Sequence, residues 1–184
     1  MVSNGDSSLR PGSGPWAYFI TFSCYGSRVH GDSAGSIDRD HNLWKTPLLS
    51  ENQRRESKER SLMSDPGYCL VETDRRIVLS ALKEHCRFRG WVLHAAHVRK
   101  THVHLVVASE EKAESILGQL KSYASRALNR AEGVRRKRWS SHGSTRYLWS
   151  ERAVDDAVDY VVGQEGAPMA VYVNARRWQE GFKS

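Results

Sequence analysis

The segment Thr101–Ala108, with the sequence THVHLVVA, constrains the fold more than any other part of the chain. Its apolar and β-branched residues favour a strand. Because side chains at positions i and i+2 of a strand point to the same face, this strand places His102 and His104 side by side. The opposite face is apolar, carries Val103, Leu105 and Val107, and is expected to cover a hydrophobic core. Two imidazoles on one face suit the binding of one ion, and the alternative is a pair of hydrogen-bonded histidines on a half-exposed sheet.

Length and composition bound the fold class and the cellular setting. The chain has 184 residues, of which 39% are hydrophobic, so we expect one domain with a substantial core. Its cysteines, Cys24, Cys69 and Cys86, are scattered singly, which is typical of a reducing compartment. No apolar run has the length of a membrane span, and the N-terminus lacks the pattern of a secretion signal. We expect a cytoplasmic, nucleoid-associated protein that does not bind membranes.

Hydrophobic periodicity predicts an alternation of strands and helices. We expect strands at Trp16–Cys24, Trp91–Val98, Thr101–Ala108 and Thr145–Trp149, and helices at Thr73–Gly90 and Glu110–Arg130. The order β-α-β-β-α-β is that of the ferredoxin-like split unit, an α+β fold with an antiparallel sheet and both helices on one face. In that topology the histidine pair lies on a central strand.

The remaining segments complete the expected domain organisation. Residues 1–15 are rich in Gly, Pro and Ser and are expected to be a disordered tail. Residues 16–184 are expected to form a single domain with a long excursion at 25–70, in which the charged stretch Glu51–Met63 could form a short helix.

An additional C-terminal helix, expected at Glu151–Gln164, brings a possible nucleophile to the histidine strand. Tyr160 and Gln164 are four residues apart, so their side chains lie on the same side of this helix, next to its apolar stripe. The histidine pair and the amide oxygen of Gln164 can hold a divalent ion with open coordination positions. The Tyr160 hydroxyl can then attack a phosphate that this ion binds.

These features together resemble the single-tyrosine HUH transposases, which include the REP-associated tyrosine transposases; HUH denotes two histidines around a bulky hydrophobic residue. The resemblance is carried by the order of elements, by His102-Val103-His104, by the segment Thr145-Arg-Tyr-Leu-Trp149 and by Asp159-Tyr-Val-Val-Gly-Gln164. Many relatives have Met-Pro-Asn where this chain has Arg99-Lys100-Thr101, and the REP-associated group has Asn-Pro near Gly163-Gln164-Glu165. These differences leave the subfamily open.

The resemblance implies a DNA strand transferase that cleaves single-stranded DNA at a hairpin-flanked site. His102, His104 and Gln164 would be metal ligands, and Tyr160 would be the nucleophile that forms a 5′-phosphotyrosine and releases a 3′-hydroxyl. Manganese or magnesium would suit such a site, with water and phosphate oxygens completing the coordination, and zinc is a less favoured alternative. The resemblance also implies a homodimer.

Positive charge close to aromatic residues predicts nucleic-acid binding. The chain has 28 Lys and Arg against 21 Asp and Glu, a net charge of +7. A basic run at 135–138 follows the second helix and precedes an aromatic residue, which suits single-stranded or hairpin DNA, and a solvated charged loop is the alternative. The candidate DNA-binding residues are Arg126, Arg130, Arg135, Arg136, Lys137, Arg138, Trp139 and Arg146.

Alternatives remain for the site and for the function. Tyr123 is a second candidate nucleophile, although it continues the apolar stripe of its helix, and at most one of His94 and His97 could join the histidine pair in a zinc-like cluster. A replication initiator or relaxase of the same superfamily is an alternative enzyme. A non-catalytic ferredoxin-like module that binds RNA or single-stranded DNA is the non-enzymatic alternative.

Overall fold

The computed structural model describes residues 14–27, 61, 66–164 and 166–175. Most of the predicted N-terminal tail, most of the 25–70 excursion and nearly all of the predicted helix Glu51–Met63 lie outside these residues. The strands are β1 (Ala17–Cys24), β2 (Val92–Val98), β3 (His102–Ala108), β4 (Trp139–Leu148) and β5 (Ala170–Val173). The helices are α2 (Glu72–Arg89), α3 (Ala113–Glu132) and α4 (Glu151–Val162).

The strands form one five-stranded sheet in the order β4-β1-β3-β2-β5, and every neighbouring pair is antiparallel. The first four strands and α2 and α3 have the predicted ferredoxin-like order, and β3 is the central strand of the sheet. The structure therefore confirms the predicted α+β fold class. The short strand β5, which pairs with β2, was not predicted, because its four residues are too few to show a periodic pattern.

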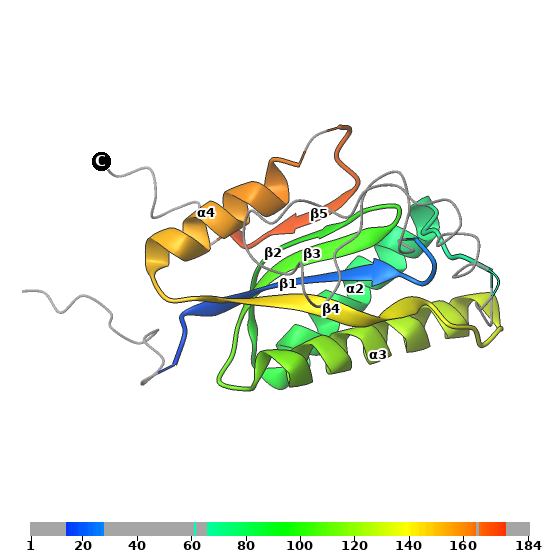
Figure 1. The fold of residues 1–184 in the computed structure, drawn as a ribbon, viewed down its shortest axis with the longest axis horizontal. Helices are drawn as coiled ribbons and strands as arrows, with labels where there is room; N and C mark the ends of the chain where they lie inside the picture. Colours follow the sequence, from blue (N-terminus) through cyan, green and yellow to red (C-terminus); the bar gives the residue numbers. More distant parts are fainter. Residues whose placement is uncertain (1–13, 28–60, 62–65, 165, 176–184) are drawn as a thin grey trace, which may run out of the picture.

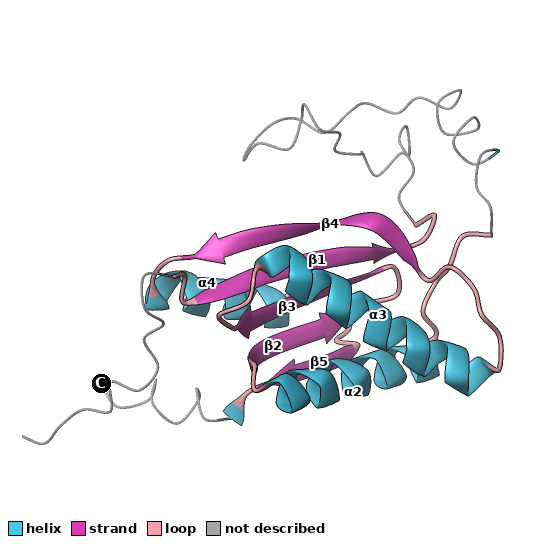
Figure 2. Ribbon diagram, turned by 90° about the horizontal axis from the view of Figure 1, so that it is seen from below, coloured by secondary structure: helices cyan, strands magenta, loops and turns pink. Residues whose placement is uncertain are grey.

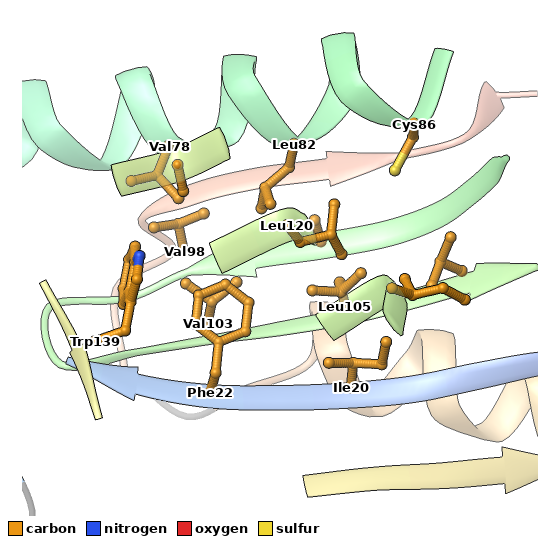
Figure 3. Close-up of a cluster of buried hydrophobic side chains, with 14 of the residues drawn as sticks. Ile20, Phe22, Val78, Leu82, Cys86, Val98, Val103, Leu105, Leu120 and Trp139 are labelled. Carbon is orange, nitrogen blue, oxygen red and sulfur yellow. The ribbon is translucent and has the colours of Figure 1, made fainter. Parts of the chain in front are cut away.

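Helices cover both faces of the sheet. Figures 1 and 2 show α2 and α3 packed against one face and α4 against the other. The main core lies between the sheet and the first two helices, and Figure 3 shows Ile20, Phe22, Val103 and Leu105 from the strands pointing toward it. A smaller apolar cluster lies beneath α4 and includes Ala95, Val106, Leu148, Val154, Val158 and Val161. Because strand side chains alternate, β1 and β3 present their polar and histidine positions to the α4 face.

The ends of α2 follow local chemistry. The helix was expected from Thr73 but begins at Glu72, and the backbone N–H of Val71 donates to the carboxylate of Asp74 at 3.2 Å. Asp74 therefore satisfies a backbone N–H at the start of the helix from the third helical position. At the other end, Gly90 adopts the left-handed conformation at φ 70°, as expected of a glycine that ends a helix.

Strand β4 is longer than predicted and begins earlier. It was expected at Thr145–Trp149 but spans Trp139–Leu148, so its first residues occupy the region that was expected to be a loop. The ammonium of Lys121 on α3 donates to the backbone carbonyl of Ser140 at 2.5 Å and attaches the start of β4 to the helix layer. This half of the strand consists mainly of polar residues and shows no hydrophobic period, because it lies at the sheet edge with one face to solvent.

None of the helices in the described part of the chain is long and apolar enough to cross a membrane.

Candidate active site

His102 and His104 lie side by side on the α4 face of β3, as the alternation predicted. Their ring centroids are 4.6 Å apart and the rings are nearly perpendicular, at 71°. His104 is buried, with 9% of its surface exposed, whereas His102 is partly exposed. The pair therefore lies where a buried sheet surface meets solvent, so a bound ion could be reached by a charged substrate.

A threonine hydroxyl holds Nδ1 of each of these histidines. Nδ1 of His104 is 2.7 Å from Oγ1 of Thr21 on β1, which is the residue directly opposite in the sheet register. Nδ1 of His102 is 3.1 Å from Oγ1 of Thr101. A hydroxyl that accepts from Nδ1–H selects the tautomer whose Nε2 lone pair can bind a metal, and it orients the ring. The two residues therefore fit a divalent cation bound through their Nε2 atoms.

Tyr160 reaches this pair from the last turn of α4. Val154, Val158 and Val161 are buried against the sheet, and this packing rotates Tyr160 to the edge of the buried stripe. The Tyr160 ring lies 5.9 Å from the His104 ring, between centroids, at 77°. It is 57% exposed, so its hydroxyl is accessible to a large substrate.

Phe19 connects the tyrosine to the histidine pair. Its ring is stacked on His104 at 5.7 Å and 16°, and it meets the Tyr160 ring edge-on at 5.7 Å and 87°. Such contacts fix the relative orientation of aromatic rings. Phe19 therefore holds both the candidate nucleophile and the candidate ligand from the neighbouring strand.

Gln164 is the second residue after α4 and is half-buried. Its side-chain nitrogen donates to the backbone carbonyl of Tyr160 at 3.2 Å, so the amide group caps the end of the helix. This bond uses the nitrogen, and the oxygen is the atom that a metal would bind. The role of Gln164 as a third ligand stays a prediction.

His97 shares the face of the histidine pair but is engaged elsewhere. It lies directly opposite His104 in the β2–β3 register and is fully buried. Its Nδ1 is 3.1 Å from the carbonyl of Val161, and its Nε2 accepts from the backbone N–H of Met169 at 3.3 Å. Burial lowers the pKa of His97, and the Arg99 cation lowers it further, although the bond to Val161 acts in the opposite direction.

The structure thus separates His97 from the predicted zinc-like cluster, because both of its ring nitrogens are bonded to backbone groups. In the described residues, no three His, Cys, Asp or Glu side chains form a group that could hold a metal ion. A cation here would have the two imidazoles of His102 and His104 as its nitrogen ligands, which leaves room for oxygen ligands from substrate and water.

Tyr123, the second candidate nucleophile, lies on α3. Its ring is stacked on His85 of α2 at 3.7 Å, and the Arg126 guanidinium lies 4.2 Å from the ring centroid. The helices α2 and α3 cover the face of the sheet opposite to α4 (Figure 2). Tyr123 on α3 and the histidine pair on the α4 face are therefore on different sides of the sheet. This favours Tyr160 over Tyr123 as the nucleophile.

Several of the predicted DNA-binding residues are exposed around the end of α3. Arg126, Arg130 and Arg135 line a shallow surface hollow together with Asn129, Gly133 and Val134. Arg136 and Lys137 are also exposed, and the Lys137 ammonium lies 4.3 Å from the Tyr25 ring centroid. This group of arginines forms a basic surface suited to phosphates.

Arg138 and Trp139 correct the prediction that both are surface residues for DNA. The Arg138 residue is 1% exposed, and its guanidinium donates to the carboxylate of Glu132 at 2.6 Å and to the side chain of Asn129 at 3.0 Å. Trp139 is 6% exposed, and its ring packs edge-on against Phe22 at 4.8 Å (Figure 3). Both side chains stabilise the start of β4, so neither is available to stack on or neutralise DNA at the surface.

Arg146 occupies the α4 face of edge strand β4. It lies directly opposite Phe19 in the β1–β4 register and is exposed. Directly opposite residues in antiparallel strands share a face. Arg146 is therefore on the same face as the histidine pair, near enough in the sheet to serve a substrate that crosses from β4 to β3.

Three residues that orient the site were not singled out from the sequence. Thr21 and Phe19 alternate on β1 with the core residues, so the period of two already placed them on the polar face. Their proximity to His104 follows only from the pairing of β1 with β3, across a sequence separation of 83 residues. Thr101 adjoins His102 in the chain, and nothing in the pattern indicated that its hydroxyl faces the ring.

A scan against models of protein families and a search of curated proteins found no match. Among solved structures, the chain is similar to a REP-associated tyrosine transposase bound to a REP hairpin, with 15% identity, a TM-score of 0.47, and coverage of 88% of this chain and 71% of that chain. It is also similar to a candidate transposase from Deinococcus radiodurans, with 13% identity, a TM-score of 0.47, and coverage of 90% of this chain and 100% of that chain. Likenesses of this size do not determine function, which depends on the residues of the site.

Proposed function

We propose that this protein is a metal-dependent endonuclease and strand transferase that acts on single-stranded DNA through a 5′-phosphotyrosine at Tyr160, as in DNA transposition. The observation that carries this proposal is the position of an accessible tyrosine 5.9 Å, between ring centroids, from a histidine that belongs to a same-face pair. A hydroxyl nucleophile beside two residues that can bind a metal suits phosphoryl transfer, because the metal polarises the phosphate that the hydroxyl attacks.

The reaction follows from what each side chain can do. The Tyr160 oxygen forms a bond to phosphorus, and the bond from phosphorus to the 3′ oxygen of the preceding nucleotide breaks. The phenol loses its proton, and the leaving 3′ oxygen gains a proton to become a hydroxyl. A manganese or magnesium ion held by His102 and His104, with Gln164 as a proposed third ligand, would polarise the phosphate. Phe19 keeps the Tyr160 ring against His104, and Thr21 keeps the His104 ring in its orientation.

The exposed arginines support a nucleic-acid substrate. Arg146 lies on the face of the site, and the proposed DNA would contact it next to the reacting phosphate. Arg126, Arg130 and Arg135 at the end of α3, with Arg136 and Lys137, would bind phosphates farther along a single strand or hairpin. A non-catalytic module of the type that binds RNA on an open sheet is less favoured, because α4 covers part of the corresponding face (Figure 1).

A homodimer is a separate expectation. Tyr160 and His104 meet within one chain, so the proposed site does not require a second copy to supply the tyrosine.

The proposal is tested by trapping the covalent protein–DNA adduct on a denaturing gel. Labelled single-stranded oligonucleotides are taken from the DNA that flanks the coding sequence and incubated with manganese or magnesium. We expect wild type and Tyr123→Phe to form the adduct and Tyr160→Phe to form none, because the phenol oxygen of Tyr160 supplies the bond to phosphorus. His102→Ala and His104→Ala are expected to abolish the adduct while the protein stays folded.

The same gel separates the competing explanations. An adduct lost only in Tyr123→Phe would move the nucleophile to the other face of the sheet and contradict the proposal. DNA binding without any adduct, across oligonucleotides that cover both flanks, would support the non-catalytic module instead.

A further inference from the structure

His97 is a fully buried histidine that the proposed reaction does not use. It comes from β2, next to His104 across the strand pair, and its two ring nitrogens contact two different segments. One is the last turn of α4, through the carbonyl of Val161, and the other is the start of the β5 segment, through the N–H of Met169. These two segments flank the turn that leaves the helix carrying Tyr160.

The partners determine the protonation of His97. A carbonyl oxygen only accepts, so Nδ1 must carry a hydrogen and donate to Val161; a backbone N–H only donates, so Nε2 must accept from Met169. His97 is therefore neutral, with its hydrogen on Nδ1. Binding of a metal at Nε2 would require the bond to Met169 to break, so His97 is suited to holding backbone rather than to ligating an ion.

The bond to Val161 adds a partner to the helix end next to Tyr160. The last carbonyls of an α-helix lack partners within the helix. Here the Asp159 carbonyl accepts from the N–H of Gly163 at 2.7 Å, the Tyr160 carbonyl accepts from the side chain of Gln164 at 3.2 Å, and the Val161 carbonyl accepts from His97. Of these three donors, only His97 belongs to the sheet.

Apolar packing restrains the position of α4 along the sheet without directional contacts. The cluster beneath the helix consists mainly of valine and alanine side chains, whose contacts are not directional. A hydrogen bond from a rigid, buried ring has a preferred distance and direction. It can therefore set the register of the last helical turn relative to β3.

We infer that His97 is a positioning residue, which anchors the last turn of α4 and thereby holds Tyr160 in place over the His102–His104 pair. This inference rests on the proposed role of Tyr160 as nucleophile. In this interpretation β2, the neighbour of β3, controls the distance between the Tyr160 nucleophile and the proposed ion. A displacement of about 1 Å at a reacting atom can slow a reaction by about a hundredfold.

Three variants separate anchoring from general stability. His97→Leu removes both hydrogen bonds and introduces an apolar side chain of similar size. His97→Asn keeps a donor near the position of Nδ1 and is expected to retain the bond to Val161. His85→Leu is the matched control, because His85 is also buried but lies on α2, on the opposite face of the sheet.

The first measurement is hydrogen exchange of the intact protein, which needs no DNA and no activity. In His97→Leu we expect faster exchange in residues 158–164 and 166–170, including the Met169 amide, and unchanged protection in β1 and β3. In His97→Asn we expect protection of α4 close to wild type. Unchanged exchange of these residues in His97→Leu would show that His97 does not anchor α4.

The second measurement is the rate of covalent adduct formation at saturating DNA, together with the DNA concentration that gives half of that rate. For His97→Leu we expect the saturating rate to fall by about tenfold or more and the half-saturating concentration to stay within about twofold, because the phosphate-binding groups are untouched. His97→Asn is expected to recover most of the rate, and His85→Leu is expected to match wild type.

The results distinguish this inference from the proposed function. A loosened α4 with an unchanged adduct rate would show that His97 anchors the helix but does not position the nucleophile, which overturns the inference. Absence of an adduct in wild type would instead overturn the proposed function, and with it the part of the inference that concerns Tyr160, while hydrogen exchange would still decide whether His97 anchors α4.

Discussion

Thr21 determines how His104 presents its ring. Its hydroxyl is 2.7 Å from Nδ1 of His104, and it reaches that atom from the neighbouring strand. When the histidine binds a metal through Nε2, Nδ1–H donates to this oxygen, which fixes the tautomer and makes the imidazole a better ligand. The proposed metal site therefore depends on a residue that is not itself a ligand.

Replacement of this hydroxyl tests the proposed metal site. Thr21→Val keeps the shape and the strand preference of the side chain but removes the bond, so we expect manganese affinity to fall by about tenfold or more with little change in folding. The measurement is calorimetric titration of the protein with manganese. Thr21→Ser should recover most of the affinity, because it keeps the hydroxyl.

Thr145→Val is the matched control for this substitution. Thr145 lies on β4 and bonds to Glu114 of α3, on the face of the sheet opposite to the histidine pair. Loss of the Thr145 hydroxyl should leave manganese affinity unchanged. Equal affinities in Thr21→Val and wild type would show that Thr21 does not tune the ligand.

At the scale of elements, the site depends on how closely β4 approaches β1. A Cβ atom at Gly143 would lie 2.8 Å from the backbone oxygen of Thr21 and 2.9 Å from Cδ2 of Leu117. The Thr21 oxygen belongs to the sheet and cannot move without disturbing β1. Glycine at this position therefore permits an approach of backbone to backbone that no other residue allows.

Gly143→Ala is expected to destabilise the fold by about 1–3 kcal/mol, because the added methyl group overpacks a contact with backbone. The measurement is urea unfolding at neutral pH. Gly118→Ala is the control, since a Cβ atom at Gly118 in α3 would meet nothing within 4 Å beyond its chain neighbours and its own helix backbone. We expect it to stabilise the protein by about 0.5–1 kcal/mol. A Gly143→Ala protein as stable as wild type would mean that β4 shifts without cost.

At the scale of the whole molecule, one polar cluster ties distant parts of the chain together. The buried Arg138, immediately before β4, pairs with Glu132 at the end of α3. The hydroxyl of Tyr68, which precedes α2, donates to Asp74 at 2.9 Å and to Glu132 at 3.3 Å. The Arg138 guanidinium also lies 4.8 Å from the Tyr68 ring centroid. The cluster therefore joins the segment before α2, both core helices and the edge strand.

This cluster makes stability depend on acid pH. Hydrogen bonds from Arg138 lower the pKa of Glu132 from 4.5 to about 2. Because the pKa of the folded state lies below that of the unfolded state, the carboxylate stabilises the fold fully above pH 4.5, and this contribution is lost as the pH falls toward 2.

We expect Glu132→Gln to be less stable than wild type by about 1–2 kcal/mol at pH 7, because it leaves the Arg138 charge without its carboxylate. The gap should narrow as the pH falls from about 5 to 2, as wild type loses the same interaction. The measurement is urea unfolding across this range. Glu72→Gln is the control, since its pair with Arg76 is exposed and should contribute less than about 0.5 kcal/mol. Parallel pH profiles of wild type and Glu132→Gln would contradict the prediction.

Local sequence patterns determined much of this protein. The period of two on β1 and β3 determined which residues face the core and placed His102 and His104 together, and the helical period of α4 placed Tyr160 beside its buried stripe. These features depend on residues close in the sequence, so backbone geometry alone decides them. The order of elements then limited the topology to the ferredoxin-like arrangement.

Tertiary structure alone decided which of several chemically similar residues are buried in structural roles and which lie at the candidate site. In the sequence, Arg138 and Trp139 continue a basic run that was predicted to lie at the surface. In the structure β4 begins earlier than predicted, and both side chains are buried. His97 and His104 are equivalent in the alternation of their strands, yet α4 and the β5 segment bond to both nitrogens of His97, whereas Thr21 on β1 bonds to Nδ1 of His104. The physical reason is that burial and hydrogen-bond partners come from elements far apart in the chain, whose meeting no local pattern encodes.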